Sequence, residues 1–195
     1  LQLTAHPILR QPRSCALAAL MLLNSARLPA RVDDAGNPLR LREQDRTLWN
    51  AAMIQRGVEY LGLATTGGEL SEFHLEAGIA ACHSTASDDA STQWIRILAL
   101  YDQLARMNPS PVIALNRAVA LARVQGAVAG LQALDALALR TALDGYLFYH
   151  AVRGTLSAEA GLGEDALRHL RRAESLANLP AERAFLARRI AEIPR

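Results

Sequence analysis

The stretch that decides the fold is AVRGTLSAEAGLGEDALRHLRRAESLAN, at residues 151–178. Apolar and small residues recur in it every three or four positions, which predicts two amphipathic helices. Gly161 lies between them, where a glycine commonly ends a helix. Gly154, Ala166 and Ala173 supply the small side chains that closely packed helices need where they cross. The stretch therefore predicts a helical hairpin.

A second hairpin precedes the first. Gly126 and Gly161 lie 35 residues apart, and each ends one helix just before another begins. The positions that follow them are in step: Gly130, Leu134 and Leu137 match Ala166, Leu170 and Ala173. Paired helices with a period near 34 residues are typical of a tetratricopeptide-like stack, in which each pair covers the apolar face of the next. We expect antiparallel helix pairs stacked as a right-handed solenoid or helical bundle.

The rest of the chain is also predicted to be helical, because no segment alternates with period two as a strand does. We expect residues 1–90 to form an N-terminal helical portion with a loop at 31–44. Residues 91–195 hold the tetratricopeptide-like helix pairs and a C-terminal capping helix, and we expect the two portions to form one continuous structural unit. An all-α protein with about nine helices follows, at 12–27, 45–64, 72–86, 93–107, 112–125, 127–138, 143–160, 163–177 and 180–193.

Composition narrows the function. Hydrophobic residues make up 51% of the chain but aromatic residues only 5%, which favours helices packed through small side chains. The net charge of +2 is too small to indicate nucleic acid or an anionic membrane as a partner. All 21 basic residues are arginine, so the chain holds no phosphate-loop, Schiff-base or general-base lysine. We expect no enzyme and no cofactor.

Cysteine usage and hydropathy indicate the compartment. Cys15 and Cys82 lie in apolar helical stretches without a CxxC spacing, which predicts two buried free thiols in a reducing environment. The longest apolar run, at 15–23, is too short to span a bilayer. We expect a soluble, cytoplasmic protein. Because the chain begins at Leu1 and not at Met, we also expect a piece of something longer.

The stretch REQDRTLWN, at 42–50, gathers charged, polar and aromatic side chains and resembles the lining of an active site. Apolar residues at helical spacing from Leu48 to Leu61 favour another interpretation. Asp45 then lies where a helix N-cap belongs, between Gln44 and Arg46, and Trp49 belongs to the core. We expect a helix start and no catalytic group.

Three acidic or imidazole side chains share one face of the helix predicted at 72–86. Glu72, Glu76 and His83 lie four and seven residues apart, so they form a line that is a weak candidate for a metal site. A half-buried histidine with satisfied hydrogen bonds is the commoner case. We expect no metal.

Polar groups of the repeats are the candidate interaction surface. Asn116 and Arg117 lie on a central helix, where an asparagine either hydrogen-bonds a peptide backbone or packs against the neighbouring helix. His150 and Arg153 lie on the repeat surface, where His150 either reaches a ligand in the groove or packs.

Several segments together resemble one family. They are ALAALMLLNSARLPAR at 16–31, DDAGNPLRLREQDRTLWN at 33–50, HLEAGIAACHS at 74–84 and LYDQLARMNPSPVIALNRAVALARVQG at 100–126. In this order they are similar to the C-terminal extension of a group of bacterial extracytoplasmic-function RNA polymerase sigma factors, which carry a tetratricopeptide-like domain behind the sigma regions. The resemblance covers the chain from about residue 12 onward, and the EQDR…W and NPSPV…LNRAVA elements are its most specific parts.

The resemblance implies a regulatory, protein-binding role. Its partners would be the chain's own sigma regions or core RNA polymerase, and promoter DNA would not be bound, because no promoter-reading helices are visible. Two other hypotheses stay open. In the first, the chain is a free-standing repeat adaptor. In the second, it binds a small molecule or metal near Glu76, His83 and His150.

Overall fold

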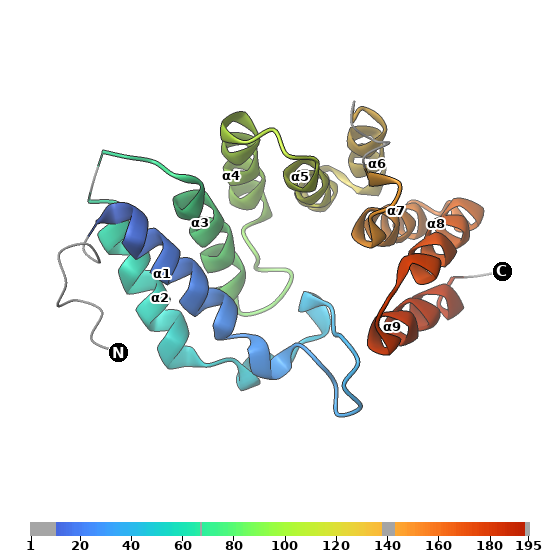
Figure 1. The fold of residues 1–195 in the computed structure, drawn as a ribbon, viewed down its shortest axis with the longest axis horizontal. Helices are drawn as coiled ribbons and strands as arrows, with labels where there is room; N and C mark the ends of the chain where they lie inside the picture. The colour runs from blue at the N-terminus through green and yellow to red at the C-terminus, as the bar shows by residue number, and fades with distance from the viewer. Residues whose placement is uncertain (1–10, 67, 138–142, 194–195) are drawn as a thin grey trace. The chain divides into compact units, whose positions relative to one another are not determined.

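The computed structural model describes residues 11–66, 68–137 and 143–193, and within them it confirms the all-α fold (Figure 1). No strand occurs in these ranges, only an isolated antiparallel bridge between Val32 and Pro38. The α-helices of the described residues are α1 (Pro12–Ser25), α2 (Ala51–Ala64), α3 (Glu72–Ser84), α4 (Trp94–Met107), α5 (Pro111–Gln125), α6 (Ala127–Asp135), α7 (Leu147–Glu159), α8 (Gly163–Leu176) and α9 (Pro180–Ala191). The predicted end of the sixth helix, residue 138, lies outside the described residues.

The chain divides into two compact units. The first unit is Leu1–Arg31 with Arg40–Asn108, and the second unit is Val32–Leu39 with Pro109–Arg195. The sequence-based boundary at residue 90 therefore differs from this division, because α4 packs against α3 and stays with the first unit. The predicted loop at 31–44 is also divided between the units: residues 32–39 belong to the second unit and the rest to the first.

The first unit is a small helical bundle. Helix α1 packs against both α2 and α3, and α3 packs against α4. Small residues allow this close packing: a Cβ atom at Gly57 would lie 2.7 Å from Leu23 Cγ, so α1 and α2 touch where glycine leaves room. One cluster of its core is formed by Cys15, Ala16, Ala19, Tyr60, Ala64 and Ala77. Both cysteines are buried free thiols, as predicted.

In the second unit the helices contact one another in the pattern of a paired-helix stack. Helices α5 and α6 pack together, as do α7 and α8, and α7 also contacts both α5 and α6. Helix α9 packs on α8. The two hairpins are in register at an offset of 36 residues, since α5 begins at Pro111 and α7 at Leu147. Gly126 and Gly161 end α5 and α7 with φ of +93° and +78°, which explains why glycine is used at both helix ends.

Each hairpin has one glycine at its closest approach, but on opposite helices. In the first hairpin Gly130 of α6 faces α5, and a Cβ there would lie 3.0 Å from the carbonyl oxygen of Ala118. In the second hairpin Gly154 of α7 faces α8, and a Cβ there would lie 3.1 Å from the carbonyl oxygen of Ala166. At the 36-residue offset Ala118 matches Gly154 and Gly130 matches Ala166. The hairpins therefore hold the same alanine–glycine pair in exchanged positions.

Two predicted helix starts are wrong. Helix α2 begins at Ala51 and not at residue 45, because the Asn50 side chain caps it by accepting a hydrogen bond from Met53 N at 3.0 Å. Helix α7 begins at Leu147 and not at residue 143, because Leu143 belongs to a separate short turn in which its carbonyl oxygen accepts a hydrogen bond from Tyr146 N at 2.9 Å.

Candidate functional site

The REQDRTLWN stretch forms two short turns before α2. Asp45 caps the second, a single 3₁₀ turn at Arg46–Leu48, and its Oδ1 accepts hydrogen bonds from Thr47 N at 2.9 Å and Thr47 Oγ1 at 2.7 Å. Gln44 is half-buried just before this turn. The turn directs Trp49 inward, where 7% of its surface remains exposed. The prediction of a core tryptophan is confirmed, whereas the prediction that Asp45 caps the following helix is wrong, because Asp45 caps this 3₁₀ turn and Asn50 caps α2.

Arg46 fastens this segment to the end of α3. Its Nη1 donates to the carbonyl oxygens of His83 at 3.0 Å and Ala86 at 2.7 Å. The last carbonyls of a helix lack partners within the helix and carry partial negative charge, so a guanidinium there satisfies both needs. Arg46 is half-buried and bridges two elements.

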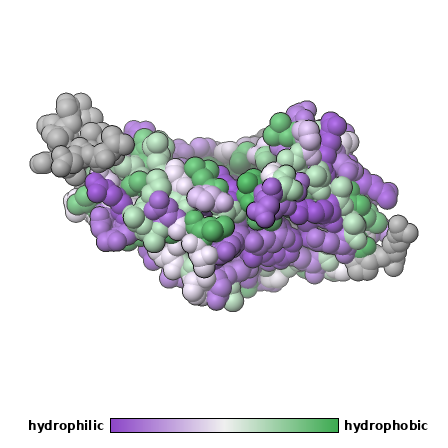
Figure 2. All heavy atoms as spheres, turned by 90° about the horizontal axis from the view of Figure 1, so that it is seen from below, coloured by the Kyte–Doolittle hydropathy of each residue, from purple (hydrophilic) through white to green (hydrophobic). Residues whose placement is uncertain are grey.

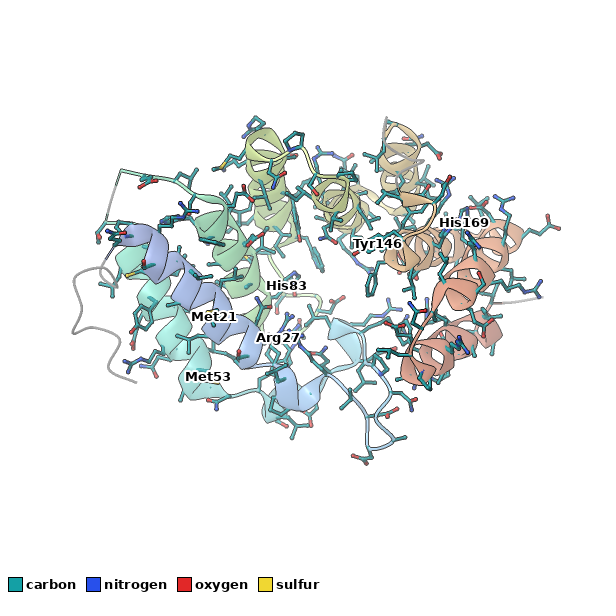
Figure 3. The ribbon with its side chains drawn as sticks, in the orientation of Figure 1. Met21, Arg27, Met53, His83, Tyr146 and His169 are labelled. Atoms are coloured by element: carbon teal, nitrogen blue, oxygen red, sulfur yellow. The ribbon has the colours of Figure 1, made fainter. Side chains whose placement is uncertain are left out.

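Two guanidinium groups lie near the same indole ring. The Cζ atom of Arg46 is 4.6 Å from the Trp49 ring centroid, and that of Arg27 is 5.9 Å from it. Both distances fall within the range of cation–π attraction. His83 lies close by and meets Trp94 edge to face, with 5.2 Å between centroids. Figure 3 shows Arg27 and His83 as neighbours, just beyond α1 and at the end of α3.

The surroundings of this cluster are positive. Burial, together with the charges of Arg31 and Arg46, lowers the pKa of Arg27 to about 10. Burial also lowers the pKa of His83 to about 4, with Arg27 and Arg46 adding to the effect and Asp89 opposing it. His83 is therefore neutral at physiological pH. We call Arg27, Arg46, Trp49 and His83 the arginine–tryptophan cluster.

The three residues of the weak metal candidate have different neighbours. Glu72 accepts a hydrogen bond from Asn108 Nδ2 at 3.1 Å. Burial and the charge of Glu72 raise the pKa of Glu76. Burial, with the charge of Glu76, raises the pKa of Tyr101 to about 12. His83 belongs to the arginine–tryptophan cluster. In the parts of the chain that the structure describes, no group of three or more His, Cys, Asp or Glu side chains is arranged to hold a metal ion.

In the second unit His150 is buried, so the prediction that it lies on the repeat surface is wrong. Its Nδ1 lies 2.9 Å from His169 Nδ1, and its Nε2 lies 3.0 Å from the Asp144 carbonyl oxygen. Arg153 donates from Nε to His169 Nε2 at 3.0 Å and from Nη1 to Asp135 at 2.7 Å. Both predicted surface residues thus take part in an internal network that joins α6, α7 and α8.

The two ends of this network determine both histidine tautomers. Because Arg153 can only donate, His169 Nε2 must be an acceptor, and the proton of the neutral ring is on Nδ1. His169 Nδ1 then donates to His150 Nδ1, which leaves the His150 proton on Nε2, facing the Asp144 carbonyl oxygen. Burial lowers the pKa of His169 to about 4, with Asp165 opposing and Arg153 adding to the effect. In this pattern each imidazole ring donates one hydrogen bond and accepts one.

Asn116 and Arg117 remain as candidates for an interaction surface. Asn116 is exposed on α5 and Arg117 is half-buried beside it. Of the two alternatives for Asn116, burial against a neighbouring helix is therefore wrong. Exposed apolar side chains lie on the same unit, among them Val112, Val128 and Phe148. Figure 2 shows hydrophobic residues interspersed with hydrophilic ones on the face it presents.

Sequence reasoning missed Arg27 and His169. Arg27 follows α1 by two residues and meets Trp49 only through the packing of the bundle. His169 lies 16 residues from Arg153 and 19 from His150, distances that no single-helix pattern connects. The only signal in the sequence was the predicted hairpin, which places residues of α7 beside residues of α8.

Fold and sites together define an all-α protein with a paired-helix unit. A family of unknown function, DUF6596, matches residues 1–65, which include the REQDRTLWN stretch. An uncharacterized protein of Rhizobium meliloti (strain 1021) is 36% identical over 176 residues. The match covers 90% of this chain but 41% of the relative, so the chain spans less than half of that protein's length. No solved structure matches the chain.

None of the described helices is both long and apolar enough to cross a membrane.

Proposed function

We propose that this chain is a regulatory, protein-interaction part of an extracytoplasmic-function RNA polymerase sigma factor. It modulates transcription initiation through contacts with the sigma regions or core polymerase, in the cytoplasm, and has no enzymatic activity, cofactor or metal of its own. The observation that carries the proposal is the length of the relative, of which more than half lies outside the match. Such a length leaves room for sigma regions beside a segment like this one.

The resemblance of the EQDR…W and NPSPV…LNRAVA elements to sigma factor extensions supports the same reading. The first element lies within the DUF6596 match, and the second forms α5 with the turn before it. Paired-helix stacks present extended surfaces that suit a peptide or a partner helix. An exposed Asn116 amide can both donate to and accept from a partner's backbone.

The charge pattern favours a protein partner over DNA. The net charge is only +2, and several arginines of the second unit are held by acids of the same unit: Arg123 by Glu159 and Arg153 by Asp135. A promoter-binding surface would instead present unpaired cations to phosphates. The chain alone is therefore expected not to bind promoter DNA.

A binding experiment tests the proposal. The chain, immobilised, is offered the purified sigma regions of the same reading frame and, separately, core RNA polymerase, with a promoter DNA fragment as a third arm. We expect retention of at least one protein and no retention of DNA. Asn116→Ala should weaken retention, whereas Asn178→Ala, which removes an equally exposed amide elsewhere in the second unit, should not. Failure to retain either protein contradicts the proposal.

A further inference from the structure

The arginine–tryptophan cluster contains polar atoms that are shielded from solvent and bonded to none of the described residues. They are Arg27 Nε, Arg46 Nη2, Trp49 Nε1 and His83 Nδ1. Three of them are obligatory N–H donors, because arginine and tryptophan side chains cannot accept a hydrogen bond. A buried donor without an acceptor is unfavourable, and buried polar groups in folded proteins are nearly always satisfied. The cluster therefore lacks acceptors.

The cluster also lacks negative charge. Arg46 uses Nη1 for two carbonyl oxygens, and neither Arg27 nor Arg46 forms an ion pair among the described residues. Two acids in the segment after α3 interact with the cluster through their charge, Asp88 with Arg46 and Asp89 with His83. Asp88 uses its carboxylate to accept from Ser91 N at 2.7 Å. Two guanidinium groups near one indole ring thus face no bonded counter-charge.

The group that would satisfy these donors has several acceptor oxygens and a negative charge. We propose that Arg27, Arg46, Trp49 and His83 form a binding site for an oxyanion, a carboxylate or a phosphate group. Guanidinium groups bind carboxylate and phosphate groups through paired N–H donors, and the indole N–H of Trp49 would donate a hydrogen bond from another side. Neutral His83 contributes one further hydrogen bond, since its tautomer can adapt to the oxyanion. Arg27 is half-buried on a long, flexible side chain and is the group able to move aside for entry.

The site is independent of the proposed function, because it is built in the first unit and not on the repeat surface. It does have a structural consequence. Arg27 follows α1, Arg46 and Trp49 precede α2, and His83 ends α3. An oxyanion bound by all four would tie together three segments that meet at one end of the bundle.

Intrinsic fluorescence suits a test, because both tryptophans of the chain, Trp49 and Trp94, adjoin the site. The whole chain is titrated at constant ionic strength with sodium phosphate, and separately with sodium acetate, against chloride. Thermal unfolding is followed in the same solutions. We expect a saturable fluorescence change with at least one of the two anions, together with a rise in Tm that saturates at the same concentration. Phosphate binding alone identifies a phosphate site, and acetate binding identifies a carboxylate site.

Variants separate the site from general salt effects, because phosphate stabilises most proteins without saturation. Arg27→Gln removes a donor of the cluster and should weaken binding about ten- to a hundredfold, as expected for a charge-assisted hydrogen bond. Arg31→Gln removes the same charge nearby, but Arg31 donates to the Asn24 carbonyl oxygen at 3.3 Å and not to the cluster. It should change the affinity less than threefold or so by screening at moderate salt. Trp94→Phe should retain the fluorescence change if Trp49 reports it.

Two results overturn the proposal. The first is the absence of any saturable change with either anion up to tens of millimolar. The second is an equal loss of binding in Arg27→Gln and Arg31→Gln, which would assign the effect to the general positive field. Circular dichroism of both variants verifies that they fold, so a loss of binding is not confused with a loss of structure.

Discussion

Replacing Gly154 by alanine tests the packing of the second unit directly. A Cβ atom at this position would lie 2.8 Å from Leu170 Cγ and 3.1 Å from the carbonyl oxygen of Ala166. Neither neighbour is the free end of a flexible side chain, so α7 and α8 must move apart. Overpacking of this kind costs about 1–3 kcal/mol, whereas alanine in place of glycine inside a helix contributes about 1 kcal/mol in the opposite direction. We expect Gly154→Ala to lower the free energy of unfolding, by up to about 2 kcal/mol.

Gly62→Ala is the matched control. Gly62 is exposed in α2, and a Cβ there would meet nothing within 4 Å. The propensity gain should then act alone and raise stability by about 0.5–1 kcal/mol. Urea unfolding followed by circular dichroism measures both variants, with Tm as a second readout at about 2–4 °C per kcal/mol. If Gly154→Ala stabilises the chain as much as Gly62→Ala does, the close-approach reasoning is refuted.

The exchanged alanine–glycine pairs allow a sharper measurement. Gly154→Ala combined with Ala166→Gly would give the second hairpin the arrangement that the first has at Ala118 and Gly130. Each single change should destabilise, but the double variant should be more stable than the sum of the two predicts, by at least about 0.5 kcal/mol. Strict additivity would mean that the two positions do not share one close contact.

The remaining predictions concern caps, protonation and thiols. Asn50→Ala should lower the free energy of unfolding by about 1 kcal/mol, and Asp45→Ala by less, because Asp45 caps a single 3₁₀ turn. Urea unfolding measures both variants, and a larger loss in Asp45→Ala than in Asn50→Ala would contradict this. His169 has a folded pKa of about 4 against an ordinary value of 6.5, so the unfolded chain binds more protons between these values. Stability should therefore fall as pH drops from 6.5 towards 4, and Tm of His169→Gln should fall less over the same interval. Cys15 and Cys82 are buried, and burial raises the pKa of Cys82, so both should react with a thiol reagent only as the chain opens; full reaction within the mixing time would contradict their burial.

The helical fold could be read from sequence because its signals are local. Apolar residues at spacings of three and four fix helices, and Gly126 and Gly161 mark helix ends that the positive φ angles confirm. Helix starts were less accessible. Asp45 and Asn50 are both good capping residues only five positions apart, and the backbone between them decides which one opens α2.

The candidate sites were less predictable because their contacts are distant in sequence. Arg46 reaches carbonyl oxygens 37 and 40 residues further on, and His150 meets His169 across a hairpin. Burial of such groups depends on how helices pack and not on any local pattern. The exposure of Asn116 was unpredictable for the same reason. Its side chain is exposed because α6 and α7 pack against other faces of α5.

The exchanged glycines constrain how such a hairpin can change over generations. Alanine at both positions would force the helices apart, whereas glycine at both would only loosen them, at a propensity cost of about 1 kcal/mol. A lineage that moves the small residue from one helix to the other therefore passes through an intermediate, alanine–alanine or glycine–glycine, that costs on the order of 1 kcal/mol of stability. Repeats related by such drift share a contact but no common glycine column, so an alignment that searches for a fixed glycine will fail to pair α5–α6 with α7–α8.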